Sequence, residues 1–401
     1  MNKISISTAV GVVAGLAVLA SSPVQATEGY FSNGYGAVNK SMAGAGVATG
    51  FDAMSQATNP AALTLVNPQF TADLSVFSPR REATLAGAGV VPGTYESDRN
   101  YFFVPSLAGA YEIDGTSMWG WAIYGNGGMN TTYDDPLGPF GGGKTGVDLA
   151  QLFIQGTYAR EVTPGFSIGI GPVIAAQRFK AFGLAPFGVA NNDYDYSYGF
   201  GGRIGFQADL VSGLRFGASY QTKMFMSEFD DYADLFAEQG DFDIPSALQA
   251  GISWEPTSGL TLAADWKRIW YSDVASVSNT FFAASPLGAD DGPGFGWDDV
   301  DTFKLGVAWE ANSTITMRFG ASLNNNPIPD EEVLFNVLAP GVQEQHYTAG
   351  LGWKLDASNT INLGAMYSPS NSVTGPNPNG GGDITIEMYQ WEATVGWTMT
   401  F

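Results

Sequence analysis

The C-terminal segment YQWEATVGWTMTF alternates between apolar and polar side chains along its whole length. Extended strands point successive side chains to opposite faces, whereas helices repeat their apolar positions every three or four residues. The apolar face of this segment carries four aromatic residues and ends on Phe401. Such a strand fits a β-sheet that meets lipid on one face and an aqueous lumen on the other.

Similar alternation occurs near 193–209, 301–310, 313–324 and 344–356, and the charges there fall on the face rich in Gly, Ser and Thr. A Lys or Arg facing lipid at mid-membrane would cost about 2–4 kcal/mol, so this sorting indicates a transmembrane barrel. The predicted lumenal cations are Arg203, Arg215, Lys223, Lys267, Lys304 and Arg318. They could hold a ligand carboxylate or pair with lumenal acids such as Asp209, Asp265 and Glu310, and the sequence leaves both open.

The connections between these segments alternate between short and long. Six short ones lie near 113–117, 162–165, 210–213, 255–259, 310–313 and 356–359, and seven long ones near 80–100, 131–146, 180–193, 228–244, 272–300, 324–343 and 369–384. Tight periplasmic turns and long extracellular loops are typical of outer-membrane barrels. The pattern predicts an all-β fold, a 14-stranded antiparallel transmembrane β-barrel with both termini on the periplasmic side.

The N-terminal region does not alternate. Lys3, the apolar run 9–20 and the small residues Val24 and Ala26 predict a signal peptide over 1–26 that directs export to the bacterial outer membrane. Residues 27–67 are rich in small residues and predict a compact, partly helical hatch. A fourteen-stranded barrel would otherwise enclose an open lumen, so we expect this hatch to plug the barrel formed by 68–401.

The formal net charge of −22 argues against nucleic acid as a partner, because nucleic acid requires a basic surface. Acidic stretches such as EFDDYADLFAEQGDFD and ADDGPGFGWDDVD lie in the long connections and are interpreted as solvated loop surface. Divalent-ion bridging at a lipopolysaccharide surface is the alternative. The sequence predicts no cofactor and no metal site.

The segment GAGVATGFDAMSQATNPAAL carries an Asn-Pro-Ala triplet, Asn59, Pro60 and Ala61, after an Ala- and Gly-rich stretch. It resembles the hatch of the FadL family, the outer-membrane transporters of long-chain fatty acids and hydrocarbons. The resemblance extends over the signal peptide, the hatch, the fourteen strands and the terminal phenylalanine. A simple helix-to-strand turn is the alternative interpretation of the triplet, since proline fixes its own φ and restricts the preceding residue.

The resemblance implies a function. A hydrophobic molecule would be captured among extracellular loops, pass through the plugged barrel and leave laterally into the bilayer through a gap in the third strand. The implied partners are this hydrophobic ligand, outer-membrane lipid and lipopolysaccharide, and the barrel-assembly machinery during insertion. The terminal aromatic residue resembles the signal that this machinery reads.

Candidate site residues follow from the same resemblance. The ligand-binding candidates from the mature N-terminus and two long loops are Tyr30, Phe31, Phe179, Phe182, Leu184, Phe187, Tyr232, Leu235 and Phe236. The alternative for the loop residues is that they only pack on one another. The lateral-opening candidates are Gly125, Gly127 and Gly128 in the third strand, because glycines weaken pairing and permit a bulge. Packing against the hatch is the alternative there.

Two other function classes are alternatives to a transporter. An outer-membrane enzyme would need a nucleophile or acid paired with histidine, but His346 is the single histidine and no G-x-S-x-G motif is present. The sequence therefore predicts no enzyme. A porin for polar solutes is the second alternative, and the predicted plug argues against it.

Overall fold

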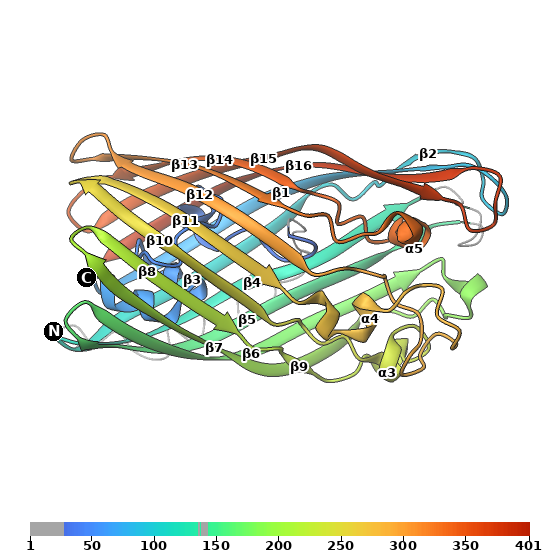
Figure 1. Cartoon of the computed structure of the whole chain (residues 1–401), viewed down its shortest axis with the longest axis horizontal. Coiled ribbons are helices and arrows are strands. Elements are labelled where there is room, and N and C mark those ends of the chain that lie inside the picture. Colours follow the sequence, from blue (N-terminus) through green and yellow to red (C-terminus); the bar gives the residue numbers. More distant parts are fainter. Residues whose placement is uncertain (1–27, 135–136, 138–142) are drawn as a thin grey trace.

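The computed structural model describes residues 28–134, 137 and 143–401. The predicted signal peptide lies outside the described residues. Fourteen long strands, each antiparallel to its neighbours, form one barrel (Figure 1). They are β1 (Gln69–Leu85), β3 (Phe102–Asp114), β4 (Ser117–Tyr133), β5 (Thr145–Thr163), β6 (Phe166–Phe182), β7 (Asp195–Val211), β8 (Leu214–Gln221), β10 (Ala247–Thr257), β11 (Leu260–Ile269), β12 (Val300–Glu310), β13 (Ile315–Asn324), β14 (Gln345–Lys354), β15 (Asn359–Pro376) and β16 (Asp383–Thr400).

The barrel closes where β16 pairs with β1, from Gln69 opposite Thr400 to Leu85 opposite Ile384. Two short strands, β2 (Gly93–Glu96) and β9 (Phe225–Met226), extend the wall by pairing with β1 and β7. The six short connections fall where the sequence predicts them. The C-terminus lies at their end of the barrel, opposite α3, α4 and α5 (Figure 1). The predicted 14-stranded antiparallel barrel is therefore confirmed.

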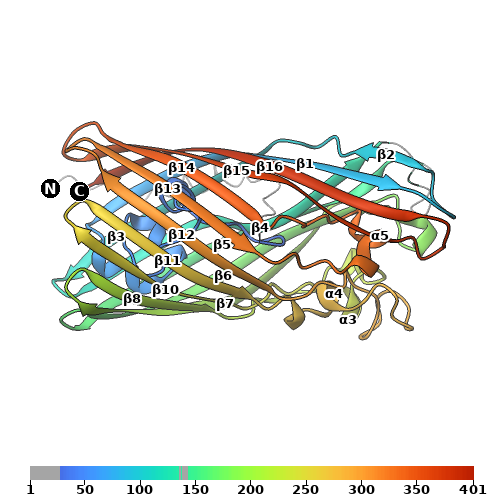
Figure 2. The same ribbon diagram turned by 45° about the horizontal axis from the view of Figure 1, so that its top comes forward.

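Several predicted loop boundaries are wrong. The predicted loop 80–100 contains the end of β1, which continues to Leu85, and the whole of β2. Most of the predicted loop 369–384 is strand, because the β15–β16 ladder continues from Asn371 opposite Met388 to Pro376 opposite Asp383. Figure 2 shows this hairpin as a long extension of the barrel. Phe179 and Phe182, predicted as loop residues, lie on β6. The end of β15 (369–376) and the end of β6 (179–182) contain few outward apolar residues. The alternating pattern that identifies the lipid-facing strands is therefore missing there, although the backbone ladder continues.

The predicted inward and outward faces are confirmed. Phe303 and Leu305 are 63% and 62% exposed on the outer surface of β12, whereas Lys304 between them is buried. Outward aromatic residues include Trp119, Trp309 and Trp353 near the short turns and Tyr101, Tyr198 and Tyr347 toward the long loops. Two such belts flank an apolar band in outer-membrane barrels.

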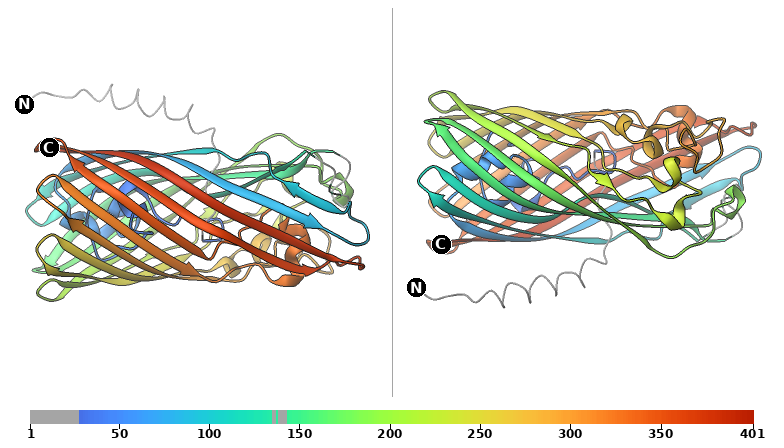
Figure 3. Two further views of the ribbon diagram at one scale, coloured as in Figure 1. Left: turned by 90° about the horizontal axis from the view of Figure 1, so that it is seen from above. Right: turned by 90° about the horizontal axis from the view of Figure 1, so that it is seen from below.

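The hatch residues 28–67 lie within the barrel in both views of Figure 3, where they are drawn in blue. They form α2 (Gly36–Lys40) and the 3-10 turns η1 (Ala53–Ala57) and η2 (Pro60–Leu65), so this segment is partly helical. The hatch approaches the wall at glycines that leave room for its backbone. An added Cβ at Gly320 would lie 2.3 Å from the carbonyl carbon of Met42, and one at Gly169 would lie 2.4 Å from the nitrogen of Ala61.

Short helical turns collect in the long loops at the other end of the barrel. They are η3 (Ala185–Phe187), η4 (Asp230–Tyr232), α3 (Ala237–Gly240), η5 (Tyr271–Asp273), α4 (Ala275–Ser278), η6 (Asp330–Glu332) and α5 (Val333–Asn336). Among the described residues, no helix has the length and apolar character to cross a membrane.

Asn59 of the predicted hatch triplet joins three parts of the molecule. Its side-chain oxygen accepts a hydrogen bond from Ala61 N (3.0 Å) and so caps η2. Its Nδ2 donates to Val47 O (2.7 Å) within the hatch and to Phe206 O (3.1 Å) on β7. The Cβ of any other residue at Gly205 would lie 2.1 Å from Asn59 Oδ1. The Asn59 side chain therefore connects η2, the hatch backbone at Val47 and β7.

We expect Asn59→Ala to loosen the hatch. The loss of a cap and of two buried hydrogen bonds costs about 2–3 kcal/mol, which should raise hydrogen exchange of amides 47–65 roughly thirty-fold or more. Hydrogen-exchange mass spectrometry of the detergent-solubilised protein measures this. Asn379→Ala, in an exposed loop, is the control. Equal exchange in the two variants would show that the triplet does not hold the hatch.

Candidate functional site

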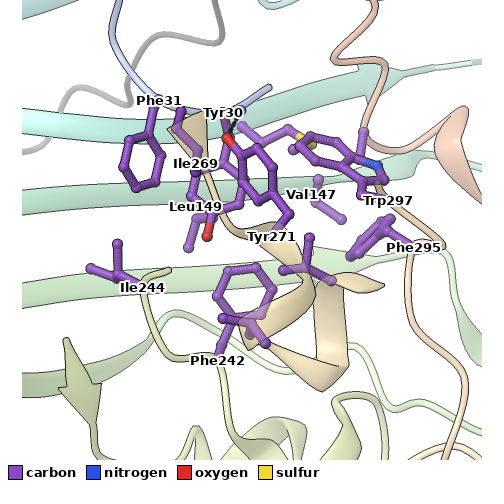
Figure 4. Close-up of a cluster of buried hydrophobic side chains, with 14 of the residues drawn as sticks. Tyr30, Phe31, Val147, Leu149, Phe242, Ile244, Ile269, Tyr271, Phe295 and Trp297 are labelled. Atoms are coloured by element: carbon purple, nitrogen blue, oxygen red, sulfur yellow. Dashed lines mark hydrogen bonds between the residues drawn. The ribbon is translucent and has the colours of Figure 1, made fainter. Parts of the chain in front are cut away.

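A cluster of apolar side chains fills the lumen between the hatch and the long loops. We call it the aromatic pocket (Figure 4). It surrounds a cavity of about 10 Å³ and is lined by Tyr30, Met129, Val147, Leu149, Phe179, Phe242, Val277, Phe295 and Trp297. Among the described residues, no charged side chain belongs to this lining. The space is too small for a ligand while the side chains keep these positions.

Tyr30 fills the centre of the aromatic pocket. Its ring centroid lies 5.1 Å from that of Tyr271, 5.9 Å from that of Trp297 and 6.1 Å from that of Phe242. Tilted and edge-on arrangements at these separations are favourable for aromatic pairs. The Tyr30 ring is therefore packed against aromatic side chains on several sides.

The backbone of residues 28–33, which we call the strap, places Tyr30. Tyr30 N donates to Tyr271 Oη (3.0 Å), and that hydroxyl donates to Glu28 O (2.6 Å). Gly29 lies between them at a φ of +66°, and a Cβ there would lie 2.5 Å from Tyr271 Oη. Glycine is needed at this position because both the conformation and the close approach exclude a side chain.

The strap is anchored on one side by charge. The carboxylate of Glu28 is fully buried and contacts Lys267 Nζ on β11 (2.6 Å) and Lys304 Nζ on β12. Lys304 Nζ also donates to the backbone oxygen of Asn33 (2.7 Å). We call Lys267 and Lys304 the lysine pair. Charges taken out of water require such close partners.

On its other side the strap pairs with an irregular part of the wall. The β4–β5 register shifts between Gly125 and Gly127, which leaves Asn126 as an extra residue. We call this the wall bulge. Ser32 N donates to Asn126 O (2.8 Å), and the amide of Gly128 donates to Tyr30 O (2.9 Å). The glycines predicted for a lateral opening thus form a bulge that contacts the hatch.

The β3–β4 ladder stops beside the wall bulge. Its last pair is Ser106 opposite Tyr124, although β3 continues toward Phe102 and β4 toward Tyr133. A wall cavity of about 160 Å³ lies there on the outer side. Its lining runs from β3 to β7 and consists of Phe103, Val104, Pro105, Gly125, Ala150, Gln151, Leu152, Ala176, Gln177, Arg178, Tyr196 and Tyr198.

The loop aromatics that the sequence predicts as ligand contacts are mostly packed together. Phe179 lies 4.8 Å from Tyr232 and 4.7 Å from Phe236 between ring centroids, and Leu235 is buried in the same cluster. Leu184 is also buried, and Phe187 packs against Phe281 and Phe335. These residues, which we call the apolar loop layer, belong to the same buried cluster as the aromatic pocket or pack against it.

At least five of the nine predicted contact residues lie in or beside the aromatic pocket, because Tyr232 and Phe236 pack against the lining residues Phe179 and Phe242. Tyr30 and Phe179 line it, and the Phe31 ring lies 5.5 Å from that of Tyr30. Phe182 instead borders an outer cavity of about 360 Å³ with Lys144, Lys180 and Tyr194. The prediction missed Val147 and Leu149, which lie near the start of β5. The inward face of β5 is apolar at these two residues, whereas the lumen of such a barrel is usually polar, and this difference is the signal that could have identified them.

Lumenal cations have mixed partners. Arg215 pairs with Asp209 (2.7 Å), as the sequence allows, and Lys223 pairs with Asp243 (2.8 Å) in a loop. Arg203 donates to Gln221 Oε1 (2.6 Å) and Arg318 to Asn362 Oδ1 (3.2 Å). Among the residues that the structure places, no group of three or more His, Asp or Glu side chains could hold a metal ion.

Known proteins provide an independent comparison. The family model described as outer membrane protein transport protein (OMPP1/FadL/TodX) matches residues 17–395. No curated protein matches the chain significantly.

Solved structures share the fold at low sequence identity. The toluene transporter TodX of Pseudomonas putida is 17% identical, with 92% of this chain and 99% of that chain covered and a TM-score of 0.68. The toluene transporter TbuX of Ralstonia pickettii is 18% identical, with 92% and 99% covered and a TM-score of 0.66. A FadL homologue of Pseudomonas aeruginosa is 15% identical, with 93% and 100% covered and a TM-score of 0.71.

The family match covers most of the chain, and the barrel agrees with the solved relatives. The protein therefore belongs to the OMPP1/FadL/TodX family of outer-membrane transport proteins.

Proposed function

We propose that this protein carries hydrophobic molecules, long-chain fatty acids or hydrocarbons, from the cell surface into the outer-membrane bilayer. The ligand enters through the apolar loop layer, takes the place of Tyr30 in the aromatic pocket and leaves sideways at the wall bulge. One observation carries the proposal: the strap connects an uncharged apolar pocket in the lumen to an incomplete part of the wall. Apolar pockets with few polar groups are typical ligand sites.

The hatch has a defined part in this route. Residues 28–67 block direct passage along the lumen, so that an apolar molecule is turned toward the wall. Their buried side chains and their contacts with β4, β7, β11 and β12 support this role. The signal peptide over 1–26 and the contacts with lipopolysaccharide and assembly machinery remain predictions from the sequence.

The two competing functions receive less support. A porin needs a wet, continuous bore, whereas the region above the hatch is apolar and filled by aromatic side chains. An enzyme needs a base beside a nucleophile at a site that a substrate can enter. His346 is buried between Ser322 Oγ (3.2 Å from Nδ1) and Gln390 Nε2 (3.2 Å from Nε2), away from the aromatic pocket lining. The family and its solved relatives are transport channels.

Conductance tests the plugged lumen. In planar bilayers we expect the full-length protein to be nearly silent, because residues 28–67 fill the bore. A variant lacking 28–67 should give steady currents on the order of a nanosiemens, since a fourteen-stranded barrel encloses a water-filled lumen. Heat modifiability on gels confirms that each barrel is folded. Nanosiemens currents from the full-length protein would favour the porin.

Deletion of Asn126 tests the lateral exit. Removing the extra residue brings Gly125 and Gly127 into one regular ladder opposite Leu152 and Gln151. The straightened strand should close the wall, and hydrocarbon uptake by cells should fall roughly tenfold or more. Asn126→Ala, which keeps the bulge but loses the side-chain bonds to Tyr35 and Gln151, is the matched control. Full uptake in the deletion variant would exclude this exit.

The transported cargo should copurify. Mass spectrometry of mildly detergent-extracted protein is expected to recover a fatty acid or hydrocarbon from cells grown on such compounds. Replacing Tyr30 by Ala enlarges the aromatic pocket and should increase the recovered amount, because the cavity no longer has to be vacated by a side chain. Recovery of nothing from either protein, together with normal hydrocarbon uptake in a deletion strain, would remove the transport proposal.

A further inference from the structure

The lysine pair lies in a setting where a carboxylate is required. Lys267 and Lys304 face the lumen from adjacent strands and are 7% and 2% exposed. Each Nζ contacts one oxygen of Glu28, which is fully buried. Among the described residues, Glu28 is the one acid within ion-pair distance of either lysine. A buried ammonium without such a partner is strongly unfavourable.

The neighbouring acid does not replace Glu28. Asp265 is opposite Lys304 in the β11–β12 register, but its Oδ2 accepts hydrogen bonds from Gly46 N (2.8 Å), Val47 N (2.9 Å) and Gln249 Nε2 (2.7 Å). Asp265 therefore holds the hatch in place. The two positive charges of the lysine pair are balanced by the two negative charges of Glu28 and Asp265. Removing the charge of Glu28 would therefore leave one buried positive charge without a counter-charge.

The lysine pair borders the aromatic pocket. Lys267 Nζ lies 5.4 Å from the centre of the Phe31 ring. Tyr271 connects the two regions, because its hydroxyl donates to Glu28 O and its ring packs against Tyr30. If the chain of a fatty acid occupied the aromatic pocket, the ammonium groups of the lysine pair would be the adjacent cations for its carboxylate.

We infer that Glu28 determines ligand specificity: the chain's own carboxylate occupies the cation site that a fatty-acid carboxylate would need, so the aromatic pocket selects uncharged hydrocarbons. The inference rests on the proposed transport function and narrows its substrate class. A carboxylate ligand would have to displace Glu28 or enter an uncharged pocket without a cation, and both are unfavourable in a buried site. A neutral hydrocarbon needs no such partner.

Binding measurements on the full-length protein in detergent test this assignment. The probes are dodecane and dodecanoate, which share a chain length and differ by the carboxylate. Native mass spectrometry or displacement of a fluorescent hydrocarbon gives both affinities, and the readout is their ratio. Wild type should prefer dodecane at least tenfold. Glu28→Gln should shift the ratio at least tenfold toward dodecanoate, because the lysine pair then lacks its internal carboxylate.

Two controls separate charge from structure. Glu28→Gln combined with Lys267→Gln leaves no surplus positive charge and should restore the wild-type ratio. Asp52→Asn removes another buried hatch carboxylate, one that caps η1 away from the lysine pair, and should leave the ratio unchanged.

The outcomes are distinct. Wild type that binds dodecanoate as tightly as dodecane overturns the inference even if no variant folds. Hydrocarbon binding by wild type with an unshifted ratio in folded Glu28→Gln also overturns the inference, and the transport proposal then stands. Wild type that binds neither probe overturns the transport proposal itself.

Discussion

Continuous backbone hydrogen bonding around a closed ring is the constraint on which this structure depends. In hydrocarbon, an unpaired N–H or C=O group costs several kcal/mol, so a sheet can cross a membrane only if its first and last strands pair. Here that seam runs the full length of β1, from Gln69 to Leu85, against β16. The outward apolar faces and inward charges follow from the same closure, because every strand must present one side to lipid.

The same constraint explains the contact between strap and wall. Where β3 and β4 separate, backbone groups of β4 lose their neighbour in the ring. Asn126 O and Gly128 N find partners in Ser32 and Tyr30 instead. A segment from the N-terminus thus supplies, from inside, hydrogen bonds that the ladder no longer makes. Gly127 allows the approach, since a Cβ there would lie 2.2 Å from Tyr30 O.

Much of the barrel could be predicted because lipid imposes a simple rule on each strand. Strand number, turn positions and the inward phase of Lys267, Lys304 and His346 follow from alternation alone. The pocket could not, because it is assembled from loops and strands far apart in sequence. Phe242 precedes β10, whereas Tyr271 and Trp297 lie 26 residues apart in the connection from β11 to β12, and no local pattern brings the three to Tyr30. Glu28 was missed because its two partners are about 240 and 276 residues away, beyond any spacing argument.

The shortness of the strap has a mechanical consequence. Tyr30 both fills the aromatic pocket with its ring and bonds β4 with its carbonyl oxygen. One residue cannot vacate the first position by a backbone movement and keep the second. In the proposed route, a ligand that displaces this backbone would also break the hydrogen bond from Gly128 N to Tyr30 O, so that filling the pocket and loosening the wall would be coupled. A solute too small to displace Tyr30 would leave that hydrogen bond intact.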